Sequence, residues 1–127
     1  MDDVGDQPDR ADTLAVVNAF NRAFASHDLT ALAGLVSARM VFEDTTPPDG
    51  RRHVGRDAVL ESFAAFFASS PTARFTWEDV VVIGSRATVL WRYDWGSEGP
   101  DQGHVRGVDV LRVQHGQVVE KLSYVKG

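Results

Sequence analysis

The sequence predicts an α+β fold, in which a curved antiparallel sheet wraps around three N-terminal helices as a cone-like barrel with one apolar pocket. Before residue 71, apolar residues recur at three- and four-residue steps, which is the period of amphipathic helices. After residue 71 the chain is rich in Val, Ile, Phe, Trp and Tyr, in runs separated by glycine-containing turns, which is typical of successive strands. Helices followed by such a sheet indicate a layered fold with a pocket at the open end of the sheet.

Length and charge exclude several classes of protein. At 127 residues the chain has the size of one domain with one core, and we expect a frayed segment over 1–8 and a single domain over 9–127. The net charge of −5 gives no basic footprint for nucleic acid or an anionic membrane surface. No apolar run is long enough for a secretory signal or a membrane span, so we expect a cytoplasmic protein.

Three helices are expected in the first half. The first begins near Asp9 and ends before a polar break at 26–28. Asp28 then provides an N-cap for a second helix over 29–36. The third helix is expected over 57–68, where a strongly aromatic face ends at a Ser-Ser-Pro sequence.

One short strand is expected over 39–42, before a Pro-Pro-Asp-Gly turn, and the basic residues after that turn are interpreted as solvated loop. Longer strands are expected over 72–83, 87–95, 105–114 and 118–126. The His-Gly pair before the last strand predicts a tight hairpin, and residues 96–101 predict a longer, mobile loop.

Asp44 lies where the short strand ends and the proline turn begins. A carboxylate in that place lies at the rim of an apolar pocket, where its pKa and reach are tuned by its neighbours. The residues alone favour a simpler role, in which Asp44 hydrogen-bonds the turn. Both interpretations stay open at this point.

Asp109 is a lone carboxylate in the Val-rich segment 105–113. If its strand face points inward, the carboxyl group lies in an apolar wall, stays protonated and donates a hydrogen bond. If the face points outward, Asp109 lies beside Arg106 or pairs across strands with Lys121. The residues do not choose between these arrangements.

Other chemistry is weakly represented. The four His residues are scattered over turns and strand ends, and there is no cysteine, so we expect no metal site. A Gly-rich phosphate loop and a Gly-x-Ser-x-Gly elbow are also missing from the sequence, and we expect no cofactor. Arg92 and Asp94 lie two apart on one strand face, where such a pair is usually at the surface or an interface. The aromatic residues Trp77, Trp91, Tyr93 and Trp95 fit a core or a dimer face, and the sequence does not say which of them lines a pocket.

The order of elements, from about Thr13 to Val125, resembles the nuclear transport factor 2-like superfamily. Two stretches are similar to steroid Δ5-isomerases (ketosteroid isomerases), and SnoaL-like cyclases share these patterns. The stretches are Val41-Phe42-Glu43-Asp44 with Gly55-Arg56-Asp57-Ala58-Val59, and Val108-Asp109-Val110-Leu111-Arg112-Val113 with Gly116-Gln117-Val118. The resemblance implies a homodimer through the outer face of the sheet.

The resemblance also implies roles for single residues. Asp44 falls on the general base of the isomerases, and Asp109 on the protonated acid of their oxyanion hole. Phe20 stands where the isomerases have the oxyanion tyrosine, and Phe63 where they have a supporting tyrosine. Since phenylalanine donates no hydrogen bond, and losing one such donor typically costs about 10²–10³ in rate, efficient steroid isomerisation is not expected.

A second resemblance is to limonene-type epoxide hydrolases, whose Arg-x-Asp strand is similar to Arg92-Tyr93-Asp94. The position of a further hydrolase Asp is Ser123 here, and the position of the water-holding tyrosine is Phe42. We rank this interpretation below the one with a base and an acid.

We therefore expect an enzyme without a cofactor that acts on an apolar, carbonyl-bearing small molecule. Asp44 would remove a proton next to the carbonyl and Asp109 would donate a hydrogen bond to the enolate, in a double-bond isomerisation or an aldol-type cyclisation. The rival class is a non-catalytic ligand-binding or dimerisation module. The pocket is expected to be lined by Phe20, Phe24, Phe42, Phe63, Phe67, Val105, Leu111 and Val125.

Overall fold

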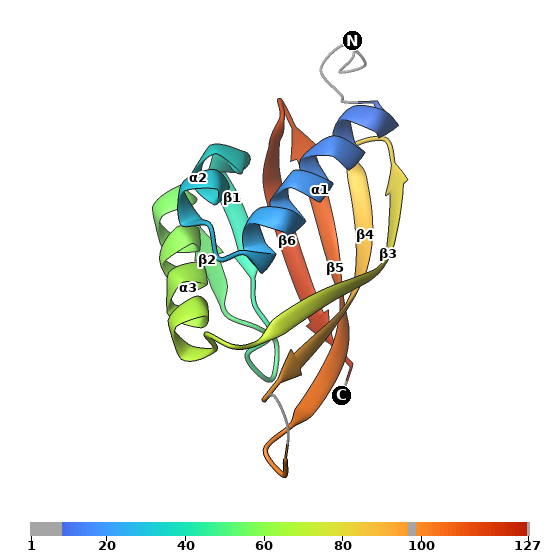
Figure 1. Cartoon of the computed structure of the whole chain (residues 1–127). Coiled ribbons are helices and arrows are strands. Elements are labelled where there is room, and N and C mark those ends of the chain that lie inside the picture. Colours follow the sequence, from blue (N-terminus) through green and yellow to red (C-terminus); the bar gives the residue numbers. More distant parts are fainter. Residues whose placement is uncertain (1–8, 97–98, 127) are drawn as a thin grey trace.

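The structure is a computed structural model that describes residues 9–96 and 99–126 (Figure 1). Three helices and a curved, unclosed sheet make up the fold, so the predicted α+β class is confirmed. The segment 1–8, expected to be frayed, and residues 97–98 of the expected mobile loop lie outside the described residues. The helices are α1 (Arg10–Ala25), α2 (Leu29–Leu35) and α3 (Arg56–Ser69).

Side-chain caps fix where the first two helices begin. A carboxylate oxygen of Asp9 accepts the backbone N–H of Asp12 at 2.8 Å, and Asp28 accepts that of Ala31 at 3.0 Å. Each cap satisfies a backbone donor that the first helical turn leaves without a partner. The expected end of the second helix differs by one residue, because Val36 already adopts extended backbone angles and begins the first strand.

The strands are β1 (Val36–Glu43), β2 (Arg52–Val54), β3 (Arg74–Ile83), β4 (Arg86–Trp95), β5 (Gly103–Gln114) and β6 (Gln117–Val125). The first strand is longer than expected. The expectation of a solvated loop after the proline turn is wrong for 52–54, because these residues pair with the end of β1 as a short edge strand. The tight His-Gly hairpin between β5 and β6 is confirmed.

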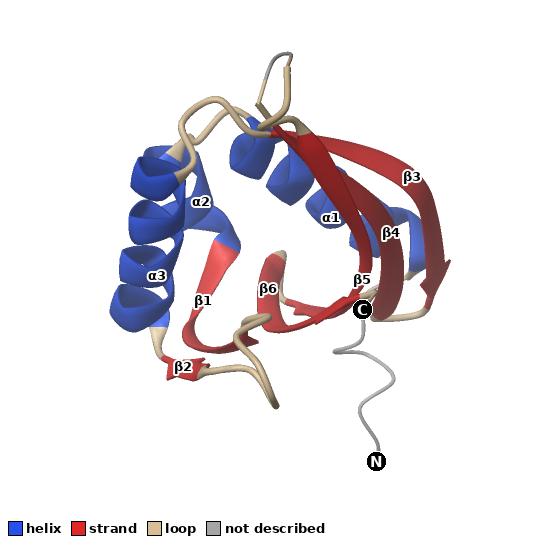
Figure 2. Ribbon diagram, turned by 90° about the horizontal axis from the view of Figure 1, so that it is seen from below, coloured by secondary structure: helices blue, strands red, loops and turns tan. Residues whose placement is uncertain are grey.

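The strand order is β2-β1-β6-β5-β4-β3, with β2 and β3 as the two edges. The pairs of β3 with β4, β4 with β5, and β5 with β6 are antiparallel, as expected. The pair of β1 with β6 is parallel, which makes the sheet mixed. Figure 2 shows the sheet curving around α1, while α2 and α3 cover the end of the sheet at β1.

Aromatic side chains from two helices fill the space inside the curved sheet. Phe24 of α1 makes edge contacts with Phe63 at 5.2 Å and Phe67 at 4.9 Å between ring centroids, both from α3. Burying each such ring stabilises the fold by about 1.5–3 kcal/mol. This cluster joins the two helices, and its lower edge forms the roof of the pocket described below.

Within residues 9–96 and 99–126, no helix combines the length and the apolar character needed to cross a bilayer.

Candidate functional site

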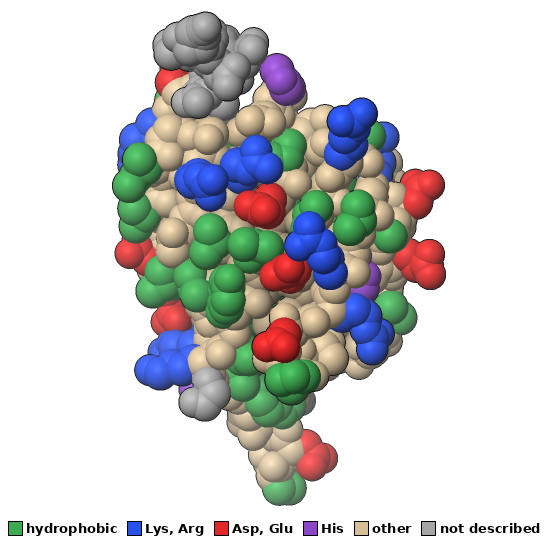
Figure 3. Space-filling view, turned by 180° about the vertical axis from the view of Figure 1, so that it is seen from behind, with side chains coloured by type: hydrophobic (Ala, Val, Ile, Leu, Met, Phe, Trp, Pro, Cys, Tyr) green, Lys and Arg blue, Asp and Glu red, His purple; other side chains and the backbone are tan. Residues whose placement is uncertain are grey.

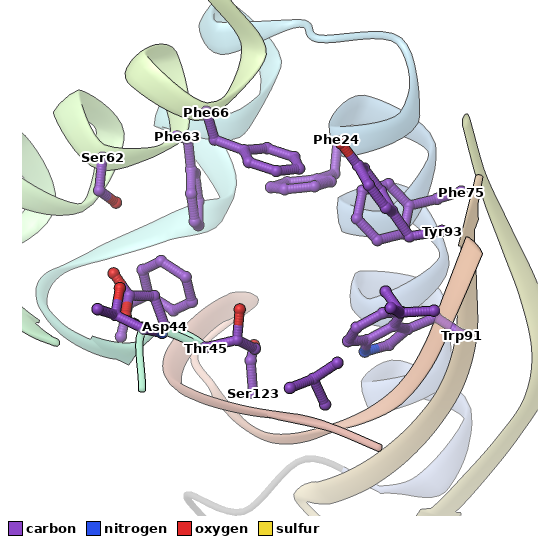
Figure 4. A pocket seen from close by; sticks show the side chains of 14 residues that line it. Phe24, Asp44, Thr45, Ser62, Phe63, Phe66, Phe75, Trp91, Tyr93 and Ser123 are labelled. Carbon is purple, nitrogen blue, oxygen red and sulfur yellow. Dashed lines mark hydrogen bonds between the residues drawn. The ribbon is translucent and has the colours of Figure 1, made fainter. Parts of the chain in front are cut away.

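A cavity of about 300 Å³ opens between α3, the loop after β1 and the ends of strands β4 to β6 (Figure 4). Most of its wall is aromatic or aliphatic. In Figure 4 the polar side chains Asp44 and Thr45 lie across the cavity from Tyr93, and Ser123 lies between Thr45 and Trp91. The complete lining is Phe24, Phe42, Asp44, Thr45, Thr46, Ser62, Phe63, Phe66, Phe75, Trp91, Tyr93, Val105, Ser123 and Val125.

The side chains expected in the pocket wall divide into two groups. Those that line the cavity are Phe24, Phe42, Phe63, Val105 and Val125. Phe20, Phe67 and Leu111 do not line it and belong to the buried core alone. Phe20 lies one helical turn before Phe24, and Leu111 lies further along β5 than Val105.

The sequence did not identify several residues of the wall. Phe66, Phe75, Trp91 and Tyr93 line the cavity, and Ser62 of α3 adds a hydroxyl group. For β4 the strand period put Trp91 and Tyr93 on one face, but it did not say that this face is the inner one. The place of Phe75 in the wall could not be predicted from the sequence, because it depends on how β3 bends across the pocket.

Asp44 combines the two roles that the sequence left open. Its Oδ1 accepts the backbone N–H groups of Arg51 at 2.7 Å and Thr46 at 3.0 Å, which holds the turn. The side chain also lines the pocket. Partial burial raises the pKa of Asp44, but the hydrogen bonds from Arg51, Thr46 and His53 outweigh burial and lower this pKa to about 2.

His53 is a partner of Asp44 that the sequence analysis assigned to a solvated loop. Its Nε2 lies 3.1 Å from Asp44 Oδ2, and its ring stacks on Phe42 with centroids 5.5 Å apart. Since an ionised carboxylate only accepts hydrogen bonds, His53 Nε2 is the donor. The pairing depends on β2, where His53 lies directly opposite Phe42 of β1.

Asp109 faces inward and is only 5% exposed, but its surroundings are not the expected apolar wall. Its Oδ1 accepts hydrogen bonds from Trp91 Nε1 at 3.0 Å and Ser123 Oγ at 2.7 Å. Lys121 Nζ lies 3.6 Å from Oδ2. The carboxylate is therefore surrounded by donors, and it lies behind the lining of the pocket and not in it. The expectation that Asp109 donates a hydrogen bond to a ligand requires a place in the lining, which Asp109 does not have.

Arg92 and Asp94 do not line the cavity. Arg92 Nε donates to both carboxylate oxygens of Asp94 at 3.1 Å, and this hydrogen bond lowers the pKa of Asp94. Tyr93, between them, points into the pocket, so strand alternation turns the pair to the other face. Among the described residues no three His, Asp or Glu side chains gather in a way that could hold a metal ion.

Residues 17–121 match the model of the SnoaL-like domain. The chain belongs to the SnoaL-like domain family. This family lies within the nuclear transport factor 2-like superfamily, which confirms the resemblance found in the sequence. No curated protein matches the chain.

Solved structures with the same fold support the assignment. A nuclear transport factor 2-like protein of unknown function from Mesorhizobium loti is 42% identical, with a TM-score of 0.80, and 93% of each chain is covered. A protein from Kribbella flavida, provisionally named a ketosteroid isomerase, is 21% identical with a TM-score of 0.78, covering 94% of this SnoaL-like chain and 82% of the other. An LEH-like epoxide hydrolase from M. tuberculosis is 14% identical with a TM-score of 0.74, covering 94% and 81%. At such low identity the last two show the shared fold alone.

Proposed function

We propose that this SnoaL-like domain is a cofactor-independent enzyme that removes a proton from the carbon next to a carbonyl group of an apolar small molecule. One observation carries the proposal, namely the position of the Asp44 carboxyl group in the wall of an otherwise largely aromatic cavity, where hydrogen bonds lower its pKa. A general base must reach the proton that it removes, and position is the first requirement for that role. Isomerisation of a double bond and aldol-type cyclisation both begin with this step.

The low pKa of Asp44 restricts the substrate. A carboxylate whose pKa is about 2 is a weak base, so it removes a proton efficiently only where the resulting enolate is well stabilised. A C–H group between two carbonyl groups, or one whose carbonyl oxygen meets a strong hydrogen-bond donor, satisfies this condition. We therefore expect activated carbonyl compounds to react and simple unactivated ketones to react slowly.

The hydrolase interpretation receives less support from the site. The Arg92–Asp94 pair lies outside the pocket, and Ser123 occupies the position where that resemblance called for a carboxylate. The alternative function, a non-catalytic ligand-binding module, would use the same pocket, but Asp44 would then remove no proton from the ligand.

We also propose that the protein is cytoplasmic and forms a homodimer through the outer face of the sheet.

The test is exchange of substrate protons for deuterium, which requires only the first step and no knowledge of the product. Apolar cyclic ketones and β-keto esters are incubated with the protein in D₂O, and loss of the proton signal next to the carbonyl is followed by NMR. The wild-type chain should accelerate exchange for at least one compound. Asp44→Asn should slow this exchange by about 10²-fold or more, because it removes the general base.

Glu43→Gln is the matched control. Glu43 is the neighbouring carboxylate, but it pairs with Arg52 at 3.0 Å and does not line the pocket. This variant should exchange protons at the wild-type rate. Equal rates in wild type and Asp44→Asn would leave the binding module as the better account.

A further inference from the structure

The ammonium group of Lys121 is buried against aromatic side chains that line the pocket. The residue is 7% exposed, although lysine is almost never fully buried unless it is paired. Its Nζ lies 4.5 Å from the ring centroid of Phe42, 5.4 Å from that of Phe24 and 5.8 Å from that of Phe63. All three rings line the cavity, so a positive charge lies directly behind the aromatic wall.

A hydrogen-bonded chain connects this charge to the cavity. Lys121 Nζ donates to Ser123 Oγ at 2.9 Å, and Ser123 Oγ donates to Asp109 Oδ1 at 2.7 Å. Ser123 itself lines the pocket. The ammonium carries three N–H donors, and the described residues provide one hydrogen-bond acceptor for them besides the longer 3.6 Å contact with Asp109.

The sheet register puts these hydrogen-bonded side chains next to Asp44, the proposed base. Glu43 of β1 is paired with Leu122 of β6 in the parallel ladder, and the next residues along the two strands are Asp44 and Ser123. Figure 4 shows both side chains on the same side of the pocket. A ligand whose proton is removed at Asp44 therefore presents its oxygen to Ser123 and to the charge behind it.

We propose that Ser123 and Lys121 form an anion subsite for the oxygen of a ligand that is, or becomes, an enolate or phenolate. The Ser123 hydroxyl, which donates to Asp109 in this structure, turns to donate to the ligand oxygen while it still accepts from Lys121 Nζ, and Asp109 keeps the hydrogen bond from Trp91. The proposal rests on the proposed function and deepens it, because it assigns the donor that Phe20 and Asp109 do not supply. Asp109 acts as a positioning residue, since its contacts with Ser123, Trp91 and Lys121 hold the chain in place. The substrate class is thus an acidic enol, a phenol or a carbonyl compound that forms such an anion.

The test uses 4-nitrophenol, whose neutral and ionised forms have different absorption spectra and whose ring suits an aromatic pocket. Binding is measured below the ordinary pKa of the free phenol. The wild-type protein should bind the phenolate, so its absorption band should grow on titration with protein. Lys121→Met should weaken phenolate binding at least about tenfold, the effect of losing one charge-assisted hydrogen bond.

Asp109→Asn should have the opposite effect and tighten phenolate binding, because it removes the negative charge that offsets Lys121. If Lys121 and Asp109 only stabilised the fold, Lys121→Met and Asp109→Asn would not change the affinity for phenolate in opposite directions. Lys126→Met and Glu120→Gln are the matched controls, since they remove a charge of each sign from β6 or its end without touching the pocket lining. Both should leave phenolate binding unchanged.

Binding of the neutral phenol by the wild type, or equal affinity in all variants, would overturn the proposal. If Lys121→Met does not fold, the ionisation state of the phenol on the wild type and the direction of change in Asp109→Asn decide the question. The measurement involves no proton abstraction from carbon. Failure here therefore leaves the role of Asp44 intact, whereas a wild-type protein that binds the phenolate but accelerates no proton exchange would reject that role alone.

Discussion

At the scale of single residues, Asp44 is held by the turn that it helps to form. Three hydrogen bonds reach its two oxygens, from two backbone N–H groups and from His53. These donors orient the carboxylate toward the cavity and also make it a weak base. Reactivity must therefore come from stabilisation of the product anion, which is the role assigned above to Ser123 and Lys121.

The low pKa of Asp44 predicts a stability effect that depends on pH. In the folded protein this pKa is about 2, against an ordinary value of 3.8. A lowered carboxylate pKa stabilises the folded state fully above the ordinary value, and this stabilisation is lost as the pH falls through the folded value. Asp44→Asn should therefore be less stable than the wild type near neutral pH, and the difference should shrink between pH 3.8 and about 2.

Urea unfolding followed by tryptophan fluorescence measures this difference at each pH. Glu43→Gln again serves as the control, because Glu43 is a partly exposed ion-pair partner of Arg52 and not part of the turn. A difference in unfolding free energy that stays constant over the whole pH range would show that the turn hydrogen bonds do not favour the ionised carboxylate.

At the scale of secondary-structure elements, irregular strand pairing decides which side chains face the pocket. In β6, Val118 pairs with Val113, but Glu120 pairs with Arg112, so one extra residue interrupts the ladder. A bulge of this kind reverses the inward and outward alternation. Val118 is inward before it, and Lys121 is inward after it.

The same bulge explains why the sequence did not place the anion subsite. Strict alternation from the apolar Val118 turns Glu120 and Leu122 inward, and leaves Lys121 and Ser123 outside. Helices, caps and the β5–β6 hairpin were predictable because their signals are local in the chain. The parallel pair of β1 with β6, the edge strand that carries His53 and the bulges depend on contacts between distant segments, which the sequence pattern does not encode.

Gly107 shows how an element positions the site. It lies opposite Trp91 in the β4–β5 ladder, and a Cβ at this position would overlap the Trp91 ring and the Tyr124 carbonyl oxygen. The missing side chain lets the indole lie against β5 and donate to Asp109. Gly107→Ala should therefore destabilise the fold by about 1–3 kcal/mol and shift the fluorescence of Trp91.

Gly34→Ala is the matched control for that substitution. Gly34 lies in α2, and a Cβ there would meet no atom within 4 Å. Because alanine favours the helix over glycine, this variant should be as stable as the wild type or more stable, by up to about 1 kcal/mol. A Gly107→Ala protein with wild-type stability and fluorescence would contradict the close packing of Trp91 on β5.

At the scale of the whole molecule, the inner and outer faces of the sheet differ in the side chains that they present. The inner face carries the pocket, and the outer face exposes apolar side chains among ion pairs (Figure 3). Leu90, Val108 and Tyr124 are directly paired across β4, β5 and β6, and they form a continuous apolar row. Contiguous exposed apolar surface often marks an interface between proteins.

We therefore propose that this row lies at the centre of the homodimer interface. Leu90 is 42% exposed in the single chain, and Leu90→Lys should convert dimers into monomers in light scattering after size exclusion. Val54→Lys, at the exposed β2 edge, should leave the dimer intact. A wild-type chain that elutes as a monomer at high concentration would reject the interface, but not the pocket chemistry.

We propose that one cavity both removes the proton at Asp44 and holds the resulting anion at Ser123 and Lys121. The most direct test is the deuterium exchange rate of a reactive carbonyl compound, measured with increasing 4-nitrophenol. Inhibition should be competitive, with an inhibition constant equal to the dissociation constant of the phenolate. Exchange that continues unchanged while the phenolate occupies the protein would show that the proton is removed elsewhere than in this cavity.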